Sequence, residues 1–171
     1  MKQPTFHHPA PGANRYVQAW WMDDAGTVTP DNVPIRETWE AMETLVDTDV
    51  ARSIGVSNFQ AQSLYDIQTY AKHPISALQV EHHPYLVQPE LLQMARENNI
   101  AVTAYSSFGP QSFLELPPAF SKRATGIPLL FDTEPVQSVA AKYKVTPGQV
   151  LLRWATQRYV VPGSTDWPVE C

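Results

Sequence analysis

Short apolar runs alternate with amphipathic segments along most of this chain, and this alternation restricts the fold more than any other feature. Apolar runs at 52–56, 77–81, 100–105 and 160–162 have the length of β-strands. The segments between them carry apolar residues at helical spacing. Strands and helices in this order form right-handed βαβ units, so the sequence predicts an α/β fold with a parallel sheet.

Five segments have the apolar spacing of an amphipathic helix. They lie at 35–46, at 60–72, from Gln88 onward, at 134–143 and at 146–158. The last of them begins with Thr146-Pro147-Gly148-Gln149, which has the pattern of a capping box with proline at the first helical position.

The same spacing predicts which side of each helix faces the core. The inward face of the first helix is expected to consist of Ile35, Trp39, Met42, Leu45 and Val46. Its glutamates are assigned to the other side; they are Glu37, Glu40 and Glu43. The inward face of the helix at 134–143 is expected to consist of Val136, Val139, Ala140 and Tyr143.

Composition and charge exclude several classes of partner. The chain has 171 residues, a formal net charge of −5 and no basic block, so we predict no nucleic-acid partner and no membrane partner. No apolar run reaches the roughly 18 residues that cross a bilayer. The opening segment lacks the apolar core of a secretory signal and Cys171 is the only cysteine, so the expected location is cytoplasmic.

Common motifs for metal and phosphate chemistry are absent from the sequence. The pairs His7-His8 and His82-His83 are adjacent residues, which point to opposite faces of a strand, so neither pair is expected to chelate one ion. There is no H-E-x-x-H, no G-x-S-x-G nucleophile elbow, and no G-x-G-x-x-G or P-loop. We therefore predict no metal site and no Rossmann-type phosphate cradle.

Polar residues follow three of the predicted strands. Ser57-Asn58 follow Val56 in the first strand, Glu81-His82-His83 follow Val80 in the second, and Tyr105-Ser106-Ser107 follow Ala104 in the third. The carboxyl ends of parallel strands open into loops at one edge of a sheet, so these residues can form the floor of a small-molecule site. The alternative is that the serines and the asparagine only cap the helices that follow them.

Three stretches in the same order resemble one known family. They are Ser53–Phe59, Gln79–Leu86 and Ala104–Glu115, and the stretch Leu151–Arg158 continues the likeness. Together they resemble the aldo-keto reductases, and within that family the fungal D-xylose reductases. Three ordered motifs make a chance match improbable.

The resemblance implies a partial (β/α)8 TIM barrel, roughly strands 4 to 8, with open edges. It covers about residues 30–162, within a single partial domain that spans 1–171. The ends at 1–29 and 163–171 match poorly, so the chain is expected to be the carboxyl-terminal part of the barrel, truncated at both ends. Open strand edges favour pairing, so the chain is expected either to associate with a second copy of itself or another fragment, or to be marginally folded.

The family reduces aldehydes and ketones with NADPH or NADH, and its motifs imply where that cofactor binds. Ser57, Asn58 and Gln79 would hydrogen-bond the nicotinamide carboxamide, and Tyr105 would stack on the nicotinamide ring. A loop that folds over the rest of the cofactor would include Ser106, Phe108, Gln111, Ser112 and Glu115. Ser164 matches the serine of the family's Ile-Pro-Lys-Ser segment, where Gly163 replaces the lysine.

Catalysis in the family needs a tyrosine acid, a lysine, an aspartate and a histidine. The first three lie in the amino-terminal strands of the barrel, and the sequence begins too late to include them. Phe6-His7-His8-Pro9 resembles the segment that bears the histidine, which assigns that role to His7. The expected activity is reduction of an aldehyde, such as an aldose of D-xylose type, to its alcohol, with this chain alone inactive.

Two alternatives to that expectation remain open. A partner chain or an upstream segment can supply the missing catalytic groups. Otherwise the chain is a non-enzymatic remnant that binds nucleotide weakly at most.

Overall fold

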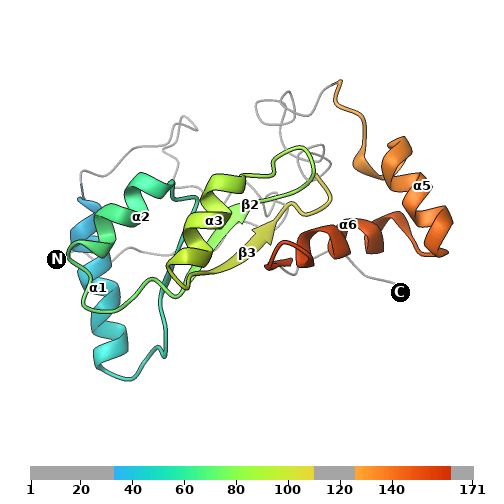
Figure 1. The fold of residues 1–171 in the computed structure, drawn as a ribbon. Coiled ribbons are helices and arrows are strands. Elements are labelled where there is room, and N and C mark those ends of the chain that lie inside the picture. Colours follow the sequence, from blue (N-terminus) through green and yellow to red (C-terminus); the bar gives the residue numbers. More distant parts are fainter. Residues whose placement is uncertain (1–32, 110–125, 163–171) are drawn as a thin grey trace, which may run out of the picture. The chain divides into compact units, whose positions relative to one another are not determined.

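The computed structural model describes residues 33–109 and 126–162. Its four strands form one parallel sheet in the order β1-β2-β3-β4, so each strand lies beside the next one along the chain. Figure 1 shows β2 beside β3. The strands are β1 (Gly55–Ser57), β2 (Ala77–Glu81), β3 (Ala101–Tyr105) and β4 (Val160–Pro162). All of the described elements belong to a compact unit that begins at Pro34.

The helices occupy the segments that the apolar spacing predicts. They are α1 (Ile35–Asp47), α2 (Ala61–Gln68), α3 (Pro89–Glu97), α5 (Glu134–Tyr143) and α6 (Pro147–Thr156), with a short 3-10 helix η3 (Leu130–Asp132) before α5. Strands that alternate with helices around a parallel sheet confirm the predicted α/β class. Helix α2 ends four residues earlier than predicted, because the chain turns there toward His73 and Pro74.

The start of α6 has the capping box that its sequence predicts. The Thr146 hydroxyl accepts a hydrogen bond from the Gln149 backbone N–H at 3.2 Å, and the Thr146 N–H donates to Gln149 Oε1 at 2.9 Å. These two bonds satisfy donors that would otherwise lack a partner in the first turn. The sequence signal is confirmed because it depends only on neighbouring residues.

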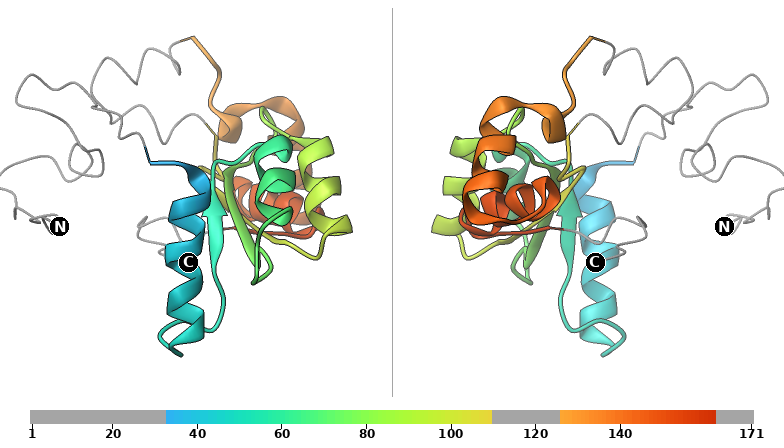
Figure 2. Two further views of the ribbon diagram at one scale, coloured as in Figure 1. Left: turned by 90° about the vertical axis from the view of Figure 1, so that its left-hand side faces the viewer. Right: turned by 90° about the vertical axis from the view of Figure 1, so that its right-hand side faces the viewer.

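One face of the sheet packs against the helices and forms the main core. Alternate residues of β2 and β3 point into it, and helices α2 and α3 lie side by side over this face (Figure 2). Its fully buried members include Leu64, Ile67, Leu78, Ala95 and Ala104. A second, smaller cluster joins η3, α5 and α6 through Leu130, Val136 and Leu151.

The prediction for the inward face of α5 is wrong in part. Val136 and Ala140 are buried, but Val139 is 39% exposed and Tyr143 is 64% exposed. In the described part of the chain α5 packs mainly on η3 and α6, which cover a narrow stripe of its surface. Periodicity identifies the apolar side of a helix but cannot give the width of the surface that covers it.

The assignment of Glu43 to the outer face of α1 is also wrong, since this residue is only 7% exposed. Its Oε1 accepts three hydrogen bonds, from Trp39 Nε1 at 2.9 Å, from the Lys72 N–H at 2.6 Å and from the His73 N–H at 2.9 Å. Burial raises the pKa of Glu43, but these three bonds outweigh it and hold that pKa below its usual value. The carboxylate therefore joins α1 to the turn after α2.

Candidate functional site

Four of the predicted site residues come together where β1, β2 and β3 end. Ser57 and Gln79 are register partners across β1 and β2. The Asn58 N–H donates to the Gln79 carbonyl at 2.8 Å, and the Tyr105 hydroxyl donates to Asn58 Oδ1 at 2.8 Å. We call Ser57, Asn58, Gln79 and Tyr105 the strand-end cluster.

The cluster lies on the face of the sheet that is opposite to the helical core. Leu78 and Val80 are buried among the helices, so Gln79 between them faces the other way and is exposed. Thr103 is its register partner on β3 and extends the same face. Sequence reasoning did not assign Thr103 to the site, because the sequence of a single strand does not determine its register with the neighbouring strand.

The backbones of β1 and β2 approach each other closely at Gly55. A Cβ atom on Gly55 would lie 2.4 Å from the Ala77 carbonyl oxygen, so only glycine permits this strand spacing. Past the strand ends, Asn58 has φ 60° and Ser106 has φ 51°, both in the left-handed region. These turns hold Asn58 beside the strands and direct the chain into the following loops.

Tyr105 is a neutral phenol with a fixed ring. Burial raises its pKa, the nearby Glu81 carboxylate raises it further, and the hydrogen bond to Asn58 lowers it in part. Glu81 is the register partner of Tyr105 and also contacts His83, whose Nε2 lies 2.9 Å from Glu81 Oε1. Sequence reasoning placed Glu81 and His83 at a strand end among residues that can form the floor of a small-molecule site, but gave neither of them a particular role.

The other predicted residues lie elsewhere or outside the described part of the chain. The side chain of Ser106 is buried, and the Phe108 ring packs at 5.3 Å from the Phe131 ring, in the smaller hydrophobic cluster. The structure does not describe His7, Gln111, Ser112, Glu115 or Ser164.

His82 belongs to the core rather than to the cluster. It is fully buried, and its ring stacks on Trp154 with the centroids 4.9 Å apart. Burial lowers its pKa, and the positive charge of Arg158 lowers it further, so the imidazole is neutral. Within residues 33–109 and 126–162, no three His, Cys, Asp or Glu side chains gather as metal ligands.

Among the described helices, none combines the length and the apolar character that a membrane span requires. The cluster itself offers an amide, a hydroxyl and an aromatic ring at the carboxyl ends of neighbouring parallel strands. Polar groups at the carboxyl ends of parallel strands that alternate with helices are typical of the α/β-barrel class of proteins. The chain belongs to the aldo/keto reductase family, whose model matches residues 13–165.

Individual relatives support that membership and confirm the resemblance seen in the motifs. The chain is 54% identical over 156 residues to a probable NAD(P)H-dependent D-xylose reductase of Aspergillus terreus, covering 90% of this chain and 48% of that protein. It is 51% identical over 154 residues to an NAD(P)H-dependent D-xylose reductase of Pyricularia oryzae, covering 88% and 47%. The chain thus spans about half the length of these curated relatives.

Solved structures confirm the fold class. The aldose reductase of Schistosoma japonicum matches with a TM-score of 0.68 and 33% identity, over 85% of this chain and 42% of that one. A Bombyx mori aldo-keto reductase in complex with NADP matches with a TM-score of 0.69 and 33% identity, over 80% and 42%. The described sheet of four parallel strands is therefore part of a TIM barrel.

Proposed function

We propose that the strand-end cluster binds the nicotinamide end of NADPH or NADH, in a site for reducing an aldehyde such as an aldose to its alcohol. The observation that carries this proposal is the hydrogen bond from Tyr105 to Asn58 beside Gln79. The names of the D-xylose reductase relatives and the NADP complex of the Bombyx mori protein support it.

The chemistry of the cluster fits a nicotinamide carboxamide, which has two N–H donors and one carbonyl acceptor. The Oδ1 atom of Asn58 already accepts from Tyr105, so its Nδ2 is left to donate to the carboxamide oxygen. Ser57 and Gln79 are exposed on the same face and offer oxygens that accept the two carboxamide N–H groups. A planar amide can thus be held at all of its polar atoms.

Tyr105 would orient the flat ring. Its hydroxyl is tied to Asn58 and its pKa is raised, chiefly by burial, so the phenol keeps its proton and its ring keeps one orientation. An aromatic face of this kind favours an offset stack with a second ring. The bound cofactor would supply the hydride for the carbonyl carbon, and the chain's own residues would decide which ring face is presented.

We infer that the chain by itself does not turn over an aldose. Reduction also needs a proton donor beside the carbonyl oxygen. Among the described residues no tyrosine hydroxyl makes a hydrogen bond to a lysine amine, although Tyr105 stands in the cluster. The expected self-association through the edge strands β1 and β4 stays a prediction that size-exclusion chromatography tests.

Titration of the purified chain with NADPH and with NADH, followed by nucleotide fluorescence, tests the binding site. Gln79→Ala should weaken binding by about 3- to 10-fold, the value of one neutral hydrogen bond. Gln62→Ala is the matched control, because Gln62 is an exposed amide on α2, away from the cluster. Equal affinities of the two variants, or no binding by the unmodified chain, would refute the proposed site.

Turnover is measured separately, by following NADPH absorbance in the presence of D-xylose. We expect no rate above the blank for the chain alone. A clear rate would refute the inference of inactivity while leaving the binding site intact. A rate that appears only with a second chain would favour catalytic groups supplied by a partner.

A further inference from the structure

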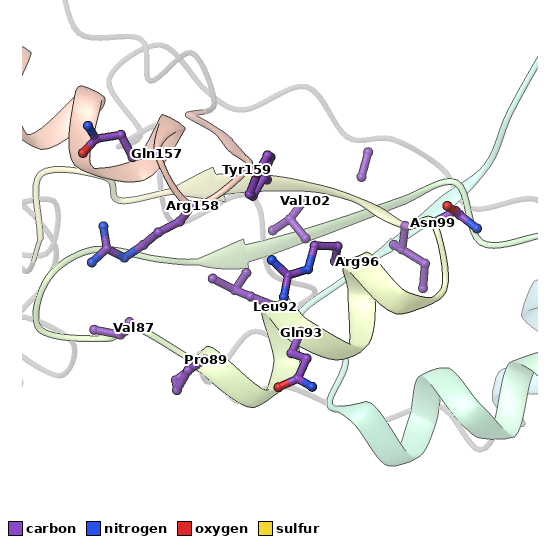
Figure 3. A pocket seen from close by; sticks show the side chains of 12 residues that line it. Val87, Pro89, Leu92, Gln93, Arg96, Asn99, Val102, Gln157, Arg158 and Tyr159 are labelled. Carbon is purple, nitrogen blue, oxygen red and sulfur yellow. The ribbon is translucent and has the colours of Figure 1, made fainter.

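An open groove with a volume of about 830 Å³ lies between α3 and the turn that joins α6 to β4 (Figure 3). Its floor includes the first residues of β3, and its far wall is the segment Gln157–Tyr159, which precedes β4. The strands are parallel, so the groove adjoins the amino-terminal ends of β3 and β4. The strand-end cluster lies at the carboxyl ends and shares no residue with the groove.

The groove is positively charged although the chain as a whole is acidic, with a net charge of −5. Two arginines, Arg96 and Arg158, line it together with uncharged residues, and no aspartate or glutamate does. Neither arginine forms an ion pair with any described residue. A concave surface with one sign of charge raises the local concentration of ions of the opposite sign.

Local contacts hold both guanidinium groups in place. Arg158 Nη1 donates to the Trp154 carbonyl at 3.0 Å, and its Cζ lies 4.0 Å from the centroid of the Trp154 ring. Arg96 Cζ lies 6.0 Å from the centroid of the Tyr159 ring. A guanidinium carries five N–H donors, so these contacts leave most of them for a ligand. Each guanidinium group therefore has N–H donors available for an anionic ligand.

Tyr159 supplies a second, independent observation. Its φ is 61°, in the left-handed region where a bulky residue is strained, and its side chain is 78% exposed beside the groove. Asn99 holds the corresponding place between α3 and β3 with φ 57°, and asparagine suits that conformation. A strained, exposed aromatic residue where asparagine or glycine would fit better points to a binding role.

We propose that this groove binds a small organic anion that carries a phosphate or carboxylate group on an apolar or aromatic body. Arg96 and Arg158 bind the anionic oxygens, and Tyr159, Leu92 and Val102 contact the apolar part. The volume lies in the range of about 300–1,000 Å³ that is usual for small-molecule sites. The groove does not depend on the proposed nicotinamide site, since the two lie at opposite ends of the strands.

The test is a titration of the full chain, labelled with ¹⁵N and free of nicotinamide nucleotide, with phenyl phosphate, benzoate and inorganic phosphate. We expect amide shifts confined to residues 87–102 and 157–160, with phenyl phosphate binding at least about fivefold more tightly than inorganic phosphate. Shifts outside the groove, or none, would overturn the proposal. Comparison of phenyl phosphate with benzoate shows which anionic group is preferred.

Charge-neutral variants identify the groups that bind. Arg96→Gln and Arg158→Gln should each weaken phenyl phosphate binding about 5- to 10-fold, as expected for loss of a charge-assisted bond. Arg153→Gln is the matched control, because Arg153 is exposed on α6 but does not line the groove. Losses of equal size in all three variants would show non-specific attraction and would overturn the proposal. Arg158→Gln alone suffices if Arg96→Gln does not fold.

Tyr159→Asn separates binding from stability. The variant relieves the left-handed strain, so its melting temperature should rise by about 2 °C. It also removes the aromatic surface, so phenyl phosphate should bind several-fold more weakly while inorganic phosphate binds as before. Unchanged affinity for phenyl phosphate would remove Tyr159 from the site and contradict the role inferred from its strain.

Discussion

Replacement of Glu43 by alanine should destabilise this protein far more than its place on a surface helix indicates. The change leaves three N–H donors without their common acceptor, those of Trp39, Lys72 and His73. The Trp39 side chain is 2% exposed, so its N–H cannot reach water, and such a donor costs about 1–3 kcal/mol. The two backbone donors lie in a half-buried turn and add about 1 kcal/mol each.

The sum is a loss of roughly 3–5 kcal/mol in the free energy of unfolding. That is a large fraction of the 5–15 kcal/mol that is typical of a folded domain, and it corresponds to a fall in melting temperature of about 10 °C. Thermal and urea unfolding, monitored by circular dichroism, measure it directly. Glu43→Ala also removes the hydrogen bonds between α1 and the turn after α2, because the Glu43 carboxylate is the group that joins them.

Glu40→Ala provides the matched control on the same helix. Glu40 is exposed and pairs with Arg36 at 2.9 Å one turn away, a surface contact worth about 0.5 kcal/mol or less. If Glu43→Ala were no less stable than Glu40→Ala, within about 0.5 kcal/mol, the reasoning from buried hydrogen bonds would be refuted.

Three further changes test the same structure. The folded pKa of Glu43 is lowered, so its contribution to stability is fully present above the ordinary pKa of 4.5 and is lost as the pH falls below that value, through the lowered folded pKa. Glu43→Gln should therefore flatten the acid-side fall in melting temperature, and an identical pH profile would contradict this. Gly55→Ala would place a Cβ 2.4 Å from the Ala77 oxygen, so it should cost about 1–3 kcal/mol of stability and weaken NADPH binding. Gly148→Ala is the control: its Cβ would meet nothing closer than 3.8 Å, so it should be neutral or stabilise the chain by up to about 1 kcal/mol. Calorimetry and titration that rank the two variants in the reverse order would disprove the spacing argument. Thr146→Ala removes the capping box of α6 and should lower the free energy of unfolding by about 1 kcal/mol in urea melts, and no measurable loss would show that the cap is unimportant.

The sequence predicted most of the secondary structure because the signals are local. The capping box at Thr146 needs only residues within one turn, and the alternation in β2 needs only its own five residues. The motifs also identified Asn58 and Tyr105, although they lie 47 residues apart. They did so through resemblance to a family, which carries spatial information that periodicity lacks.

Residues with no such motif could not be placed in advance. Glu43 reads as one of several surface glutamates, and its burial depends on two backbone N–H groups 29 and 30 residues away. Tyr159 reads as an ordinary residue before a strand, and its left-handed backbone follows from how the chain leaves α6. Neither the burial of Glu43 nor the left-handed backbone of Tyr159 can be predicted from the neighbouring residues in the sequence.

The amino-acid sequence by itself determined the helices, the strands and their parallel order, because backbone geometry and apolar spacing act over a few neighbouring residues. Tertiary structure alone decided the register that sets Gln79 beside Ser57 and Thr103, the burial of Glu43 and the groove between α3 and the turn before β4. Those features depend on distances between segments far apart in the chain, which only close packing of the whole unit defines.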